Sequence, residues 1–238
     1  MILEVSSVTK AFGGLVAIHD LDLAINEGEV VGLIGPNGSG KTTSFNLISG
    51  FIKPDRGEII FNGKDITGFK PHRICQYGIA RTFQLTKPFA GLTALQNVMI
   101  GMMYGEGKIR SVAKAKMECE KILEFVGLVE RGHSPVTSFG TVDRKKLEIA
   151  RALATKPRLL LLDEMMSGLT ATEMEEAVQL VKAIGDSGIT IIVVEHVMKA
   201  ILEISSRLIV LNYGEKIAEG EPREVVRNEQ VIEAYLGE

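Results

Sequence analysis

The 238-residue sequence contains only two cysteines, carries little net charge and has no long apolar run. Cys75 and Cys119 lie far apart and belong to no metal-type spacing, so we interpret them as packing residues of a protein from a reducing compartment. The net charge of −3 excludes a strong general field that would attract nucleic acid or anionic lipid. At this length the chain is able to bury a large core and to form one α/β domain, alone or with a helical appendage.

The hydrophobic segments are too short for a bilayer. The longest apolar runs, Leu159–Leu162 and Ile189–Val194, fall far short of the roughly 20 residues that a membrane-spanning helix needs. The first residues, Met1–Val5, lack the basic and apolar regions of a signal peptide. The sequence therefore predicts a soluble cytoplasmic protein, whose association with a membrane would come from a partner.

A glycine-rich segment with the pattern of a phosphate-binding loop follows the apolar run Val30–Ile34 and precedes the helical pattern Ser44–Ile48. Glycine lets backbone N–H groups close around a polyphosphate at a helix N-terminus, where the helix dipole favours anions. Lys41 is expected to reach the β- and γ-phosphates, and Thr42 to offer its hydroxyl to Mg²⁺. The segment therefore predicts binding of a nucleoside triphosphate. Its residues are Gly35, Pro36, Asn37, Gly38, Ser39, Gly40, Lys41, Thr42 and Thr43.

Short β-type runs at both ends of the chain flank a middle part with helical periodicity. Two runs, 159–162 and 189–194, lack alternation, as expected for central parallel strands covered by helices on both faces. Between about residues 85 and 155 strand signals are almost absent, which predicts an α/β fold with an inserted helical lobe. The expected strands are Leu3–Val8, Leu21–Ile25, Val30–Ile34, Glu58–Phe61, Ile79–Phe83, Arg158–Leu162, Thr190–Val194, Leu208–Leu211 and Lys216–Glu219, with a hairpin turn at Asn62-Gly63. The expected helices are Thr42–Ser49, Leu95–Met102, Arg110–Val126, Arg144–Leu153, Glu173–Ile184 and Met198–Ile204.

Two neighbouring acids follow the apolar run that ends at Leu162. A strand that ends in paired acids delivers them to the carboxyl edge of the sheet, where ligands bind in such folds. We expect Asp163 to hold Mg²⁺, commonly through water, and Glu164 to polarise the attacking water. An ordinary strand followed by a helix N-terminus also favours acids, but the phosphate loop makes the catalytic interpretation the better one.

Three further residues are candidates for the same site. His196 follows the strand Thr190–Val194 and is a candidate contact of the γ-phosphate and the water, although a lone histidine in such a place is commonly structural. Gln84 stands at the entry to the helical lobe, where its amide is able to sense Mg²⁺ and water. Phe12, which precedes two glycines, is either an adenine stacker or a core phenylalanine.

The order of these motifs along the whole chain resembles the nucleotide-binding subunits of ABC transporters. The aromatic loop at Phe12, the Walker A segment Gly35–Thr42, Gln84, the Walker B segment Leu160–Glu164 and His196 occur in the family's order. Several phrases are closer still to the ATP-binding subunits of branched-chain amino acid importers. These phrases are Phe12–Ala17, Gly78–Gln84, Leu147–Leu153, Val194–His196 and Ala234–Glu238.

The resemblance implies one ABC nucleotide-binding domain over residues 1–238. Its P-loop NTPase (RecA-like) core, of about residues 1–84 and 156–220, would carry an antiparallel β subdomain. An α-helical subdomain would be inserted at about residues 85–155, and a helical tail would follow at 221–238. The implied catalytic residues are Glu164, His196, Gln84 and Lys41. The implied ligands of Mg²⁺ are Thr42, Gln84 and Asp163, and ATP would bind to Phe12 and to residues 35–43.

The resemblance also implies partners. In that family two such subunits sandwich two ATP molecules head to tail, and their closure drives two integral membrane permease subunits. A helix of each permease docks near Gln84, in a groove that Phe89–Met103 would line unless this stretch is plain helical core. The expected location is the cytoplasmic face of the cell membrane, as a peripheral subunit. Contact with a solute-binding protein would be only indirect, and no nucleic acid is expected.

The segment before the helical run Arg144–Leu153 departs from the family, most members of which have Leu-Ser-Gly-Gly-Gln there. If the motif is aligned by counting back from the helix, Phe139–Asp143 occupy its five positions. If it is aligned on Ser138 and Gly140 instead, two extra residues remain before the helix. Neither frame restores the motif. In the family this loop faces the γ-phosphate held by the other subunit, so branched threonine and valine side chains in place of glycine would crowd the approach.

Two more departures follow the paired acids. Met165 replaces the usual proline, and the segment Ser167–Thr170 ends in threonine where the family generally has Asp or Asn, a residue that communicates with the opposite ATP site. The chain's own phosphate loop and acids are intact. We therefore expect one competent site that the partner's signature completes and one weak site that uses the altered loop. A homodimer would have two weakened sites. The resemblance favours a heterodimer, because branched-chain amino acid importers typically pair two different ATPase subunits, unless the altered loop works normally.

The expected function is that of an ATP-binding and ATP-hydrolysing subunit that powers an importer of branched-chain or other amino acids. One alternative is a soluble ABC ATPase without a transport role, which would usually show a second cassette, a coiled-coil insertion or a basic patch. The other is a nucleotide-binding switch with weak hydrolysis, which the altered signature suggests and which intact Glu164 and His196 oppose. The solute and the direction of transport rest on the resemblance, because no residue of this chain is expected to touch the solute.

Overall fold

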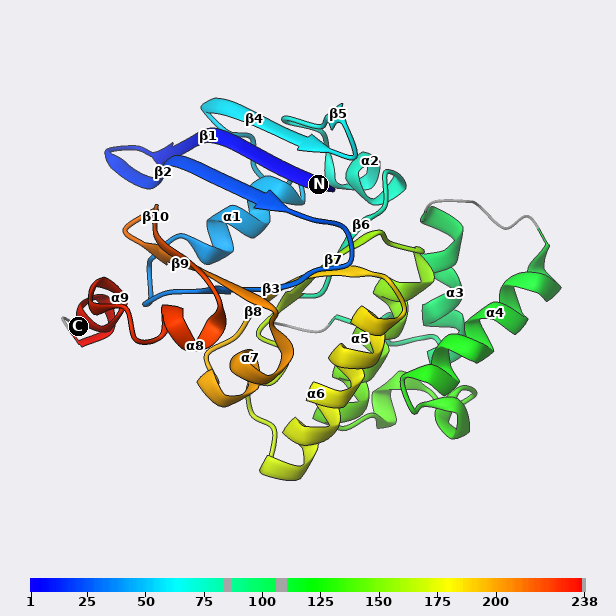
Figure 1. The fold of residues 1–238 in the computed structure, drawn as a ribbon. Coiled ribbons are helices and arrows are strands. Elements are labelled where there is room, and N and C mark those ends of the chain that lie inside the picture. The colour runs from blue at the N-terminus through cyan, green and yellow to red at the C-terminus, as the bar shows by residue number, and fades with distance from the viewer. Residues whose placement is uncertain (84–86, 106–110, 237–238) are drawn as a thin grey trace.

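The computed structural model describes residues 1–83, 87–105 and 111–236. A 4-stranded antiparallel sheet lies above a 6-stranded, mainly parallel sheet, and most of the helices lie on the far side of the larger sheet (Figure 1). The predicted α/β fold with an antiparallel β subdomain and a helical part is therefore confirmed.

The antiparallel sheet has the strand order β2-β1-β4-β5. The Asn62-Gly63 turn joins β4 to β5, as predicted, and both residues have positive φ angles of 50° and 71°, which Asn and Gly tolerate best. The sheet covers one face of the molecule and leaves the larger sheet in the interior. Its strands are β1 (Leu3–Phe12), β2 (Leu15–Ile25), β4 (Arg56–Phe61) and β5 (Lys64–Asp65).

The larger sheet brings the candidate motifs to one edge. Its order is β10-β9-β3-β8-β7-β6, in which β10 pairs antiparallel with β9 and the other pairs are parallel. Because β3, β8 and β7 are parallel neighbours, the segments that follow them meet at the same carboxyl edge. The strands are β3 (Val30–Ile34), β6 (Ile79–Arg81), β7 (Leu159–Asp163), β8 (Thr190–Val194), β9 (Arg207–Asn212) and β10 (Glu215–Gly220).

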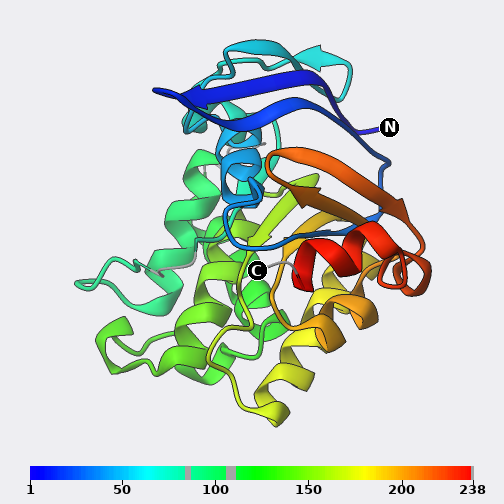
Figure 2. The same cartoon turned by 90° about the vertical axis from the view of Figure 1, so that its left-hand side faces the viewer.

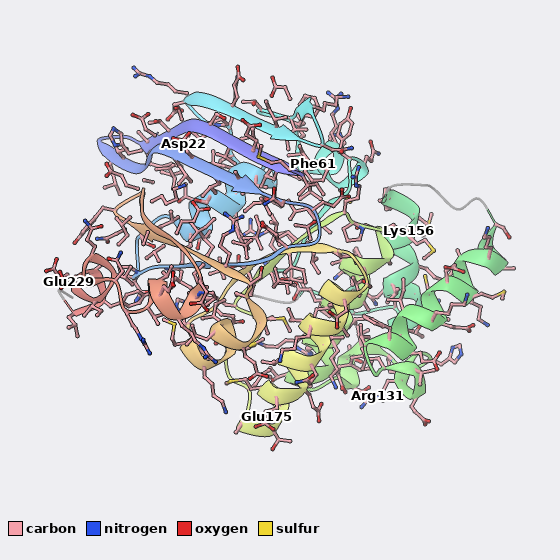
Figure 3. The ribbon with its side chains drawn as sticks, in the orientation of Figure 1. Asp22, Phe61, Arg131, Lys156, Glu175 and Glu229 are labelled. Carbon is pink, nitrogen blue, oxygen red and sulfur yellow. The ribbon has the colours of Figure 1, made fainter. Side chains whose placement is uncertain are left out.

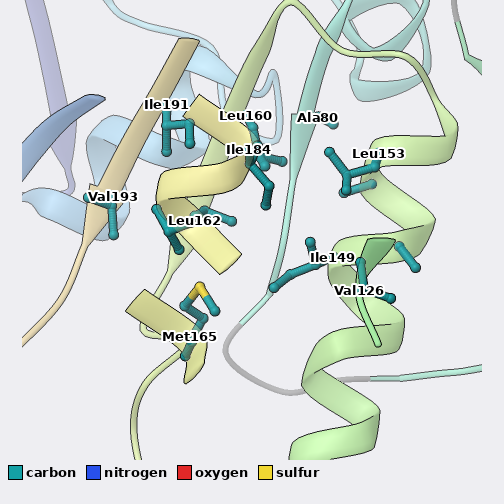
Figure 4. Packing of buried hydrophobic residues seen from close by; sticks show 14 of the residues in the cluster. Ala80, Val126, Ile149, Leu153, Leu160, Leu162, Met165, Ile184, Ile191 and Val193 are labelled. Atoms are coloured by element: carbon teal, nitrogen blue, oxygen red, sulfur yellow. The ribbon is translucent and has the colours of Figure 1, made fainter. Parts of the chain in front are cut away.

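Alternate side chains of the central strands enter two separate cores. Leu159 and Leu161 pack on the side of the antiparallel sheet and of α1 (Lys41–Ile48), which lies between the two sheets. Leu160 and Leu162 enter the second core, which the helices cover (Figure 4). Burial of each such side chain stabilises the fold by about 1.5–3 kcal/mol. The two-sided burial explains why these strands read as unbroken apolar runs.

The helices α3, α4 and α5 pack together at one side of the molecule (Figure 2). At the start of α3 the Thr93 hydroxyl accepts the Gln96 N–H, and the Gln96 side chain accepts the Thr93 N–H, so a capping box fixes this end. These helices lie within the predicted insertion, whose bounds stay a prediction. They are α3 (Ala94–Tyr104), α4 (Val112–Phe125) and α5 (Thr141–Ala154).

The remaining helices cover the larger sheet and the C-terminal part. Helices α6 and α7 pack against each other beneath the sheet, and α8 and α9 lie beside β10 at the C-terminal end (Figure 1). None of the helices in the described part of the chain is long and apolar enough to span a bilayer. The bounds are α2 (Pro71–Gln76), α6 (Ala171–Asp186), α7 (Met198–Ile204), α8 (Pro222–Val225) and α9 (Glu229–Leu236).

The observed bounds differ from the predicted ones mainly where elements are exposed. Strand β1 runs on to Phe12 and β2 starts at Leu15, because backbone pairing continues into an exposed hairpin whose apolar residues do not alternate with polar ones. Within the described residues, the helix predicted from Arg110 begins at Val112, after the cap Ser111. The apolar pattern does not predict α2, although Pro71 at its N1 position is a start signal.

Candidate nucleotide-binding and catalytic site

The phosphate loop lies between β3 and α1 and depends on its glycines. Gly35, Gly38 and Gly40 have positive φ angles of 148°, 75° and 105°. A Cβ on Gly35 would lie 2.1 Å from the carbonyl oxygen of Leu211, and one on Gly40 would lie 2.6 Å from Ile18 Cδ1. Both positions therefore require glycine on grounds of conformation and of space.

Lys41 is buried at the start of α1 and points back over the loop. Its Nζ donates to the carbonyl oxygens of Gly35 and Pro36 at 2.6 and 2.7 Å, and to Ser39 Oγ at 3.3 Å. The ammonium group is thus held on the loop that the sequence predicts as the phosphate cradle. A bound polyphosphate would offer it charged oxygens in place of neutral carbonyls, a stronger class of hydrogen bond.

We expect Gly40→Ala to weaken ATP binding by tenfold or more, because the strain of a non-glycine residue at this φ costs about 1–3 kcal/mol and the new Cβ collides with Ile18. Equilibrium titration with a fluorescent ATP analogue measures the change. Gly91→Ala is the matched control, since a Cβ on Gly91 meets nothing within 4 Å and its φ is not positive. Equal affinities for the two variants would contradict the assigned role of the loop.

The second acid and the histidine come together at the carboxyl edge of the sheet. Glu164 directly follows β7 with a φ of 49°, and its N–H donates to the carbonyl of Val194 at 2.9 Å. Its Oε1 lies 2.6 Å from His196 Nε2, so the structure brings these two predicted residues into direct contact. A non-glycine residue at positive φ is uncommon and is typical of functional sites.

Asp163 forms a buried ion pair with Arg81, a residue that none of the sequence motifs singles out. Arg81 Nη2 donates to Asp163 Oδ2 at 2.7 Å, and Arg81 Nη1 donates to Asn46 Oδ1 at 2.6 Å. Both charged side chains are 7% exposed. The one sequence feature that could have indicated this ion pair is the basic residue Arg81 within the predicted strand Ile79–Phe83. Loss of one partner would leave a buried charge, at a cost of about 3–5 kcal/mol.

The side chains in this region fit a magnesium site. Thr42 is exposed in the first turn of α1, and Asp163 supplies a carboxylate at the end of β7. A hydroxyl and a carboxylate are hard oxygen donors, the ligands that Mg²⁺ prefers together with the oxygens of substrate phosphates.

The structure describes only one of the two remaining predicted site residues, Phe12 and Gln84. Gln84 lies outside the described residues, but Phe83 just before it is held, because its N–H donates to Glu148 Oε1 of α5 at 2.5 Å. Glu148 is a contact that the sequence patterns do not reveal. Phe12 is 49% exposed, which excludes the core alternative, and Lys10 Nζ lies 5.5 Å from its ring centroid. Adenine stacking on Phe12 stays a prediction.

An arginine and an aspartate brace the altered signature segment. Helix α5 begins at Thr141 with Gly140 as its N-cap, and Phe139 is buried, which favours the frame that counts back from the helix. Arg131 Nη1 donates to Asp143 Oδ2 at 3.0 Å, and Arg131 is labelled at the edge of the helical part in Figure 3. A glycine N-cap has no side chain to accept hydrogen bonds from the N–H groups of the first helical turn. At the position of Gly140, a ligand would therefore find only backbone donors.

Comparisons with known proteins identify the family. The family profile described as ABC transporter matches residues 18–167, and the profile described as branched-chain amino acid ATP-binding cassette transporter matches residues 215–238. The chain belongs to the ABC transporter family. It is an ATP-binding ABC ATPase, as its motif order predicts.

Several relatives of this ABC ATPase align over its whole length. The branched-chain amino acid transport ATP-binding protein BraF of Pseudomonas aeruginosa is 37% identical, and the match covers 100% of this chain and 98% of BraF. LivG of Escherichia coli, also a branched-chain amino acid transport ATP-binding protein, is 36% identical over the same shares of the two chains. Its counterpart in Archaeoglobus fulgidus, named as a probable transport protein, is 36% identical and covers 99% of this chain and 95% of its own length.

Solved ABC cassettes share the fold. The ADP conformation of the cassette MJ1267 superposes with a TM-score of 0.89 at 33% identity, over 100% of this chain and 99% of that chain. The cassette MJ0796, solved as a dimer, superposes with a TM-score of 0.84 at 27% identity, over 93% of this chain and 99% of that chain. The agreement over the full length confirms the ABC ATPase fold.

Proposed function

We propose that this ABC ATPase hydrolyses Mg-ATP to power an importer of branched-chain or other amino acids. The observation that carries the proposal is the arrangement at the carboxyl edge of the parallel sheet. The phosphate loop, the acids Asp163 and Glu164, and His196 follow three neighbouring strands of this sheet. The role of BraF and LivG in branched-chain amino acid transport supports the substrate class.

The proposed reaction is in-line attack of water on the γ-phosphoryl group of ATP. Phe12 stacks on the adenine, and Lys41 exchanges its carbonyl partners for the β- and γ-phosphates. Glu164 accepts the proton of the attacking water, while His196 orients Glu164 and the water. Mg²⁺ held by Thr42, Asp163 and Gln84 would neutralise charge on the phosphates.

The site requires a second ATP-binding subunit, because the signature helix that completes the electrostatics comes from the other subunit of the sandwich. The dimeric form of the MJ0796 cassette supports such pairing. Gly140, Thr141 and Val142 occupy the signature positions of this chain, so its own signature would serve the opposite site poorly. A heterodimer with a partner that has an intact signature follows from this asymmetry.

We assign the contact with two integral membrane permease subunits to an apolar groove of about 280 Å³ that Phe83 helps to line. The groove lies between α2 and β6 on one side and α3 and α5 on the other. Of the predicted stretch Phe89–Met103, Ile100 and Gly101 line the groove, whereas Leu95 and Val98 are buried in the helical core. The stretch therefore serves both purposes. Exposed or partly exposed residues of the groove include Phe51, Cys75, Phe83, Ile100, Tyr104 and Arg151.

Tyr104→Glu should uncouple the subunit from its permeases. The side chain is 63% exposed and lines the groove, so a charge there would have to be desolvated on docking. We expect at least a tenfold loss of permease copurification with unchanged ATP affinity. Met117→Glu is the matched control, because Met117 is 60% exposed on α4 and does not line the groove.

Thiol alkylation reports on the same docking site. Burial raises the pKa of the half-buried Cys75 thiol, which lines the groove, and raises that of Cys119, which is 0% exposed, to about 11. Slow alkylation of Cys75 in the free subunit should become slower still in the transporter, while Cys119 stays unreactive in both. Equal alkylation of Cys75 in the free and assembled protein would place the docking site elsewhere.

The assembled location follows from these partners. The subunit would be peripheral at the cytoplasmic face of the cell membrane, held there by the permeases, and would meet the solute-binding protein only through them. Affinity purification from membranes tests this proposal. We expect two permease subunits and a second ATP-binding subunit in the eluate, and recovery of the chain in a purely soluble complex would contradict it.

A further inference from the structure

Two side chains from different elements hold the loop that follows the catalytic acids. This loop, Met165–Leu169, joins Glu164 to α6. Lys145 of α5 donates from Nζ to the carbonyl oxygens of Met165 and Ser167, at 2.7 Å each. Glu195, which precedes His196, accepts the Met166 N–H at Oε1, also at 2.7 Å. Three consecutive residues of the loop are thus fixed through their backbone.

The two anchoring side chains are withdrawn from water to different degrees, since Glu195 is buried and Lys145 is half-buried. Glu195 is 5% exposed, and burial raises the pKa of its carboxyl, against the opposing effect of the backbone hydrogen bonds that it accepts and of the Lys145 charge. Burial lowers the pKa of the Lys145 ammonium, against the opposing charges of Glu195, Glu148 and Glu164. A charged group that is partly or wholly buried is destabilised when it loses its hydrogen bonds. The bonds to the loop therefore stabilise the two charged side chains as well as the loop.

The sequence departures of this chain meet at the same place. Val142, in the altered signature, and Met165, in place of the usual proline, line one small cavity together with Leu169. Met165 is 6% exposed and packs in the core cluster that contains Leu162 and Ile149 (Figure 4). Apolar side chains thus join the start of α5 to the loop beside the polar anchors.

We infer that Lys145 and Glu195 are positioning residues that tie the signature helix α5 to the catalytic Glu164 of the same subunit. Lys145 lies two residues beyond the altered signature segment, and the loop that it holds starts directly after Glu164. Glu195 secures the same loop from the strand end that carries His196. A rotation of α5 is thereby passed to the loop and to Glu164, not only to the opposite ATP site.

Amide hydrogen exchange of the isolated wild-type chain and of Lys145→Met tests this inference without ATP turnover. We expect exchange at Met166–Leu169 to accelerate about tenfold in the variant, because two charge-assisted hydrogen bonds are lost. Exchange in the phosphate loop and in β7 should stay unchanged. Lys145→Arg, which keeps a cation and several donors, should restore most of the protection.

Glu195 offers a second pair of variants. Glu195→Gln keeps an oxygen that accepts the Met166 N–H and should leave exchange within about twofold, whereas Glu195→Leu removes the acceptor and should accelerate it about tenfold. Unchanged exchange in both Lys145→Met and Glu195→Leu would overturn the inference. So would acceleration that spreads evenly over the chain, since that would show a merely structural role.

The kinetic test rests on the proposed role of Glu164. In the complex with the second ATP-binding subunit, Lys145→Met should lower kcat about tenfold and leave KM for ATP within about twofold, because ATP binding is untouched while the base is misplaced. Lys145→Arg should recover kcat. A rise in KM with unchanged kcat would contradict a positioning role, while the exchange results would still stand on their own and leave the ATPase assignment intact.

Discussion

We expect Glu164→Gln to lower ATP turnover at least about a hundredfold while ATP binding persists. The magnitude is that of a lost general base, which typically contributes 10²–10⁴-fold. In the wild-type chain Glu164 Oε1 lies 2.6 Å from His196 Nε2. Glutamine keeps the shape of the side chain and an oxygen for this contact, but it cannot take the proton of water. Steady-state phosphate release in the complex with the second ATP-binding subunit measures the effect.

The control for this variant is Glu175→Gln. Glu175 lies on the exposed face of α6, and Figure 3 labels it at the outer end of that helix. It loses the same charge without touching the site and should keep wild-type turnover. Substantial turnover of Glu164→Gln beside an unaffected Glu175→Gln would show that another group is the base, and the assignment of Glu164 would fall.

Turnover of this chain by itself should be at least tenfold lower than in the presence of its second ATP-binding subunit. The reason lies at the start of α5, where Gly140 provides no hydroxyl and where the side chains of Thr141 and Val142 would crowd the approach to the opposite nucleotide. Replacement of donors that stabilise charge in a transition state has effects of about 10²–10³ in kcat, so a defective signature is expected to have a clear effect.

The triple variant Gly140→Ser/Thr141→Gly/Val142→Gly restores the signature residues at three positions and keeps Asp143 for its contact with Arg131. Its turnover without the partner should exceed that of the wild-type chain about tenfold or more. Gly140→Ser alone is the control, because it adds an N-cap hydroxyl without opening the backbone. Robust turnover of the wild-type chain alone would show that the altered loop functions as it stands, and the asymmetry would be abandoned.

Much of the fold follows from local patterns. The predicted apolar runs at 159–162 and 189–194 correspond to β7 and β8, because both faces of these strands are buried. The glycine loop and the acids fall at the carboxyl edge because parallel strands place them there. The apolar pattern does not predict strand bounds where the side chains are exposed. In the hairpin between β1 and β2, backbone pairing continues although apolar and polar residues do not alternate.

The contacts within the site are less predictable because they join residues that are distant in sequence. Arg81 and Asp163 are 82 residues apart and meet only because β6 pairs with β7. The bond between Lys145 and the loop at Met165 likewise depends on how α5 packs against the sheet, which no local pattern records. Gln84 lies outside the described residues, and its role stays a prediction.

ATP hydrolysis by the complete transporter in lipid vesicles, measured with and without leucine and the solute-binding protein, tests the central claim most directly. The account predicts turnover that rises with leucine-loaded solute-binding protein, accompanies leucine uptake and disappears with Glu164→Gln. Turnover that is indifferent to leucine, isoleucine and valine, with no uptake of any of them, would contradict the claim that this ATPase powers an amino acid importer.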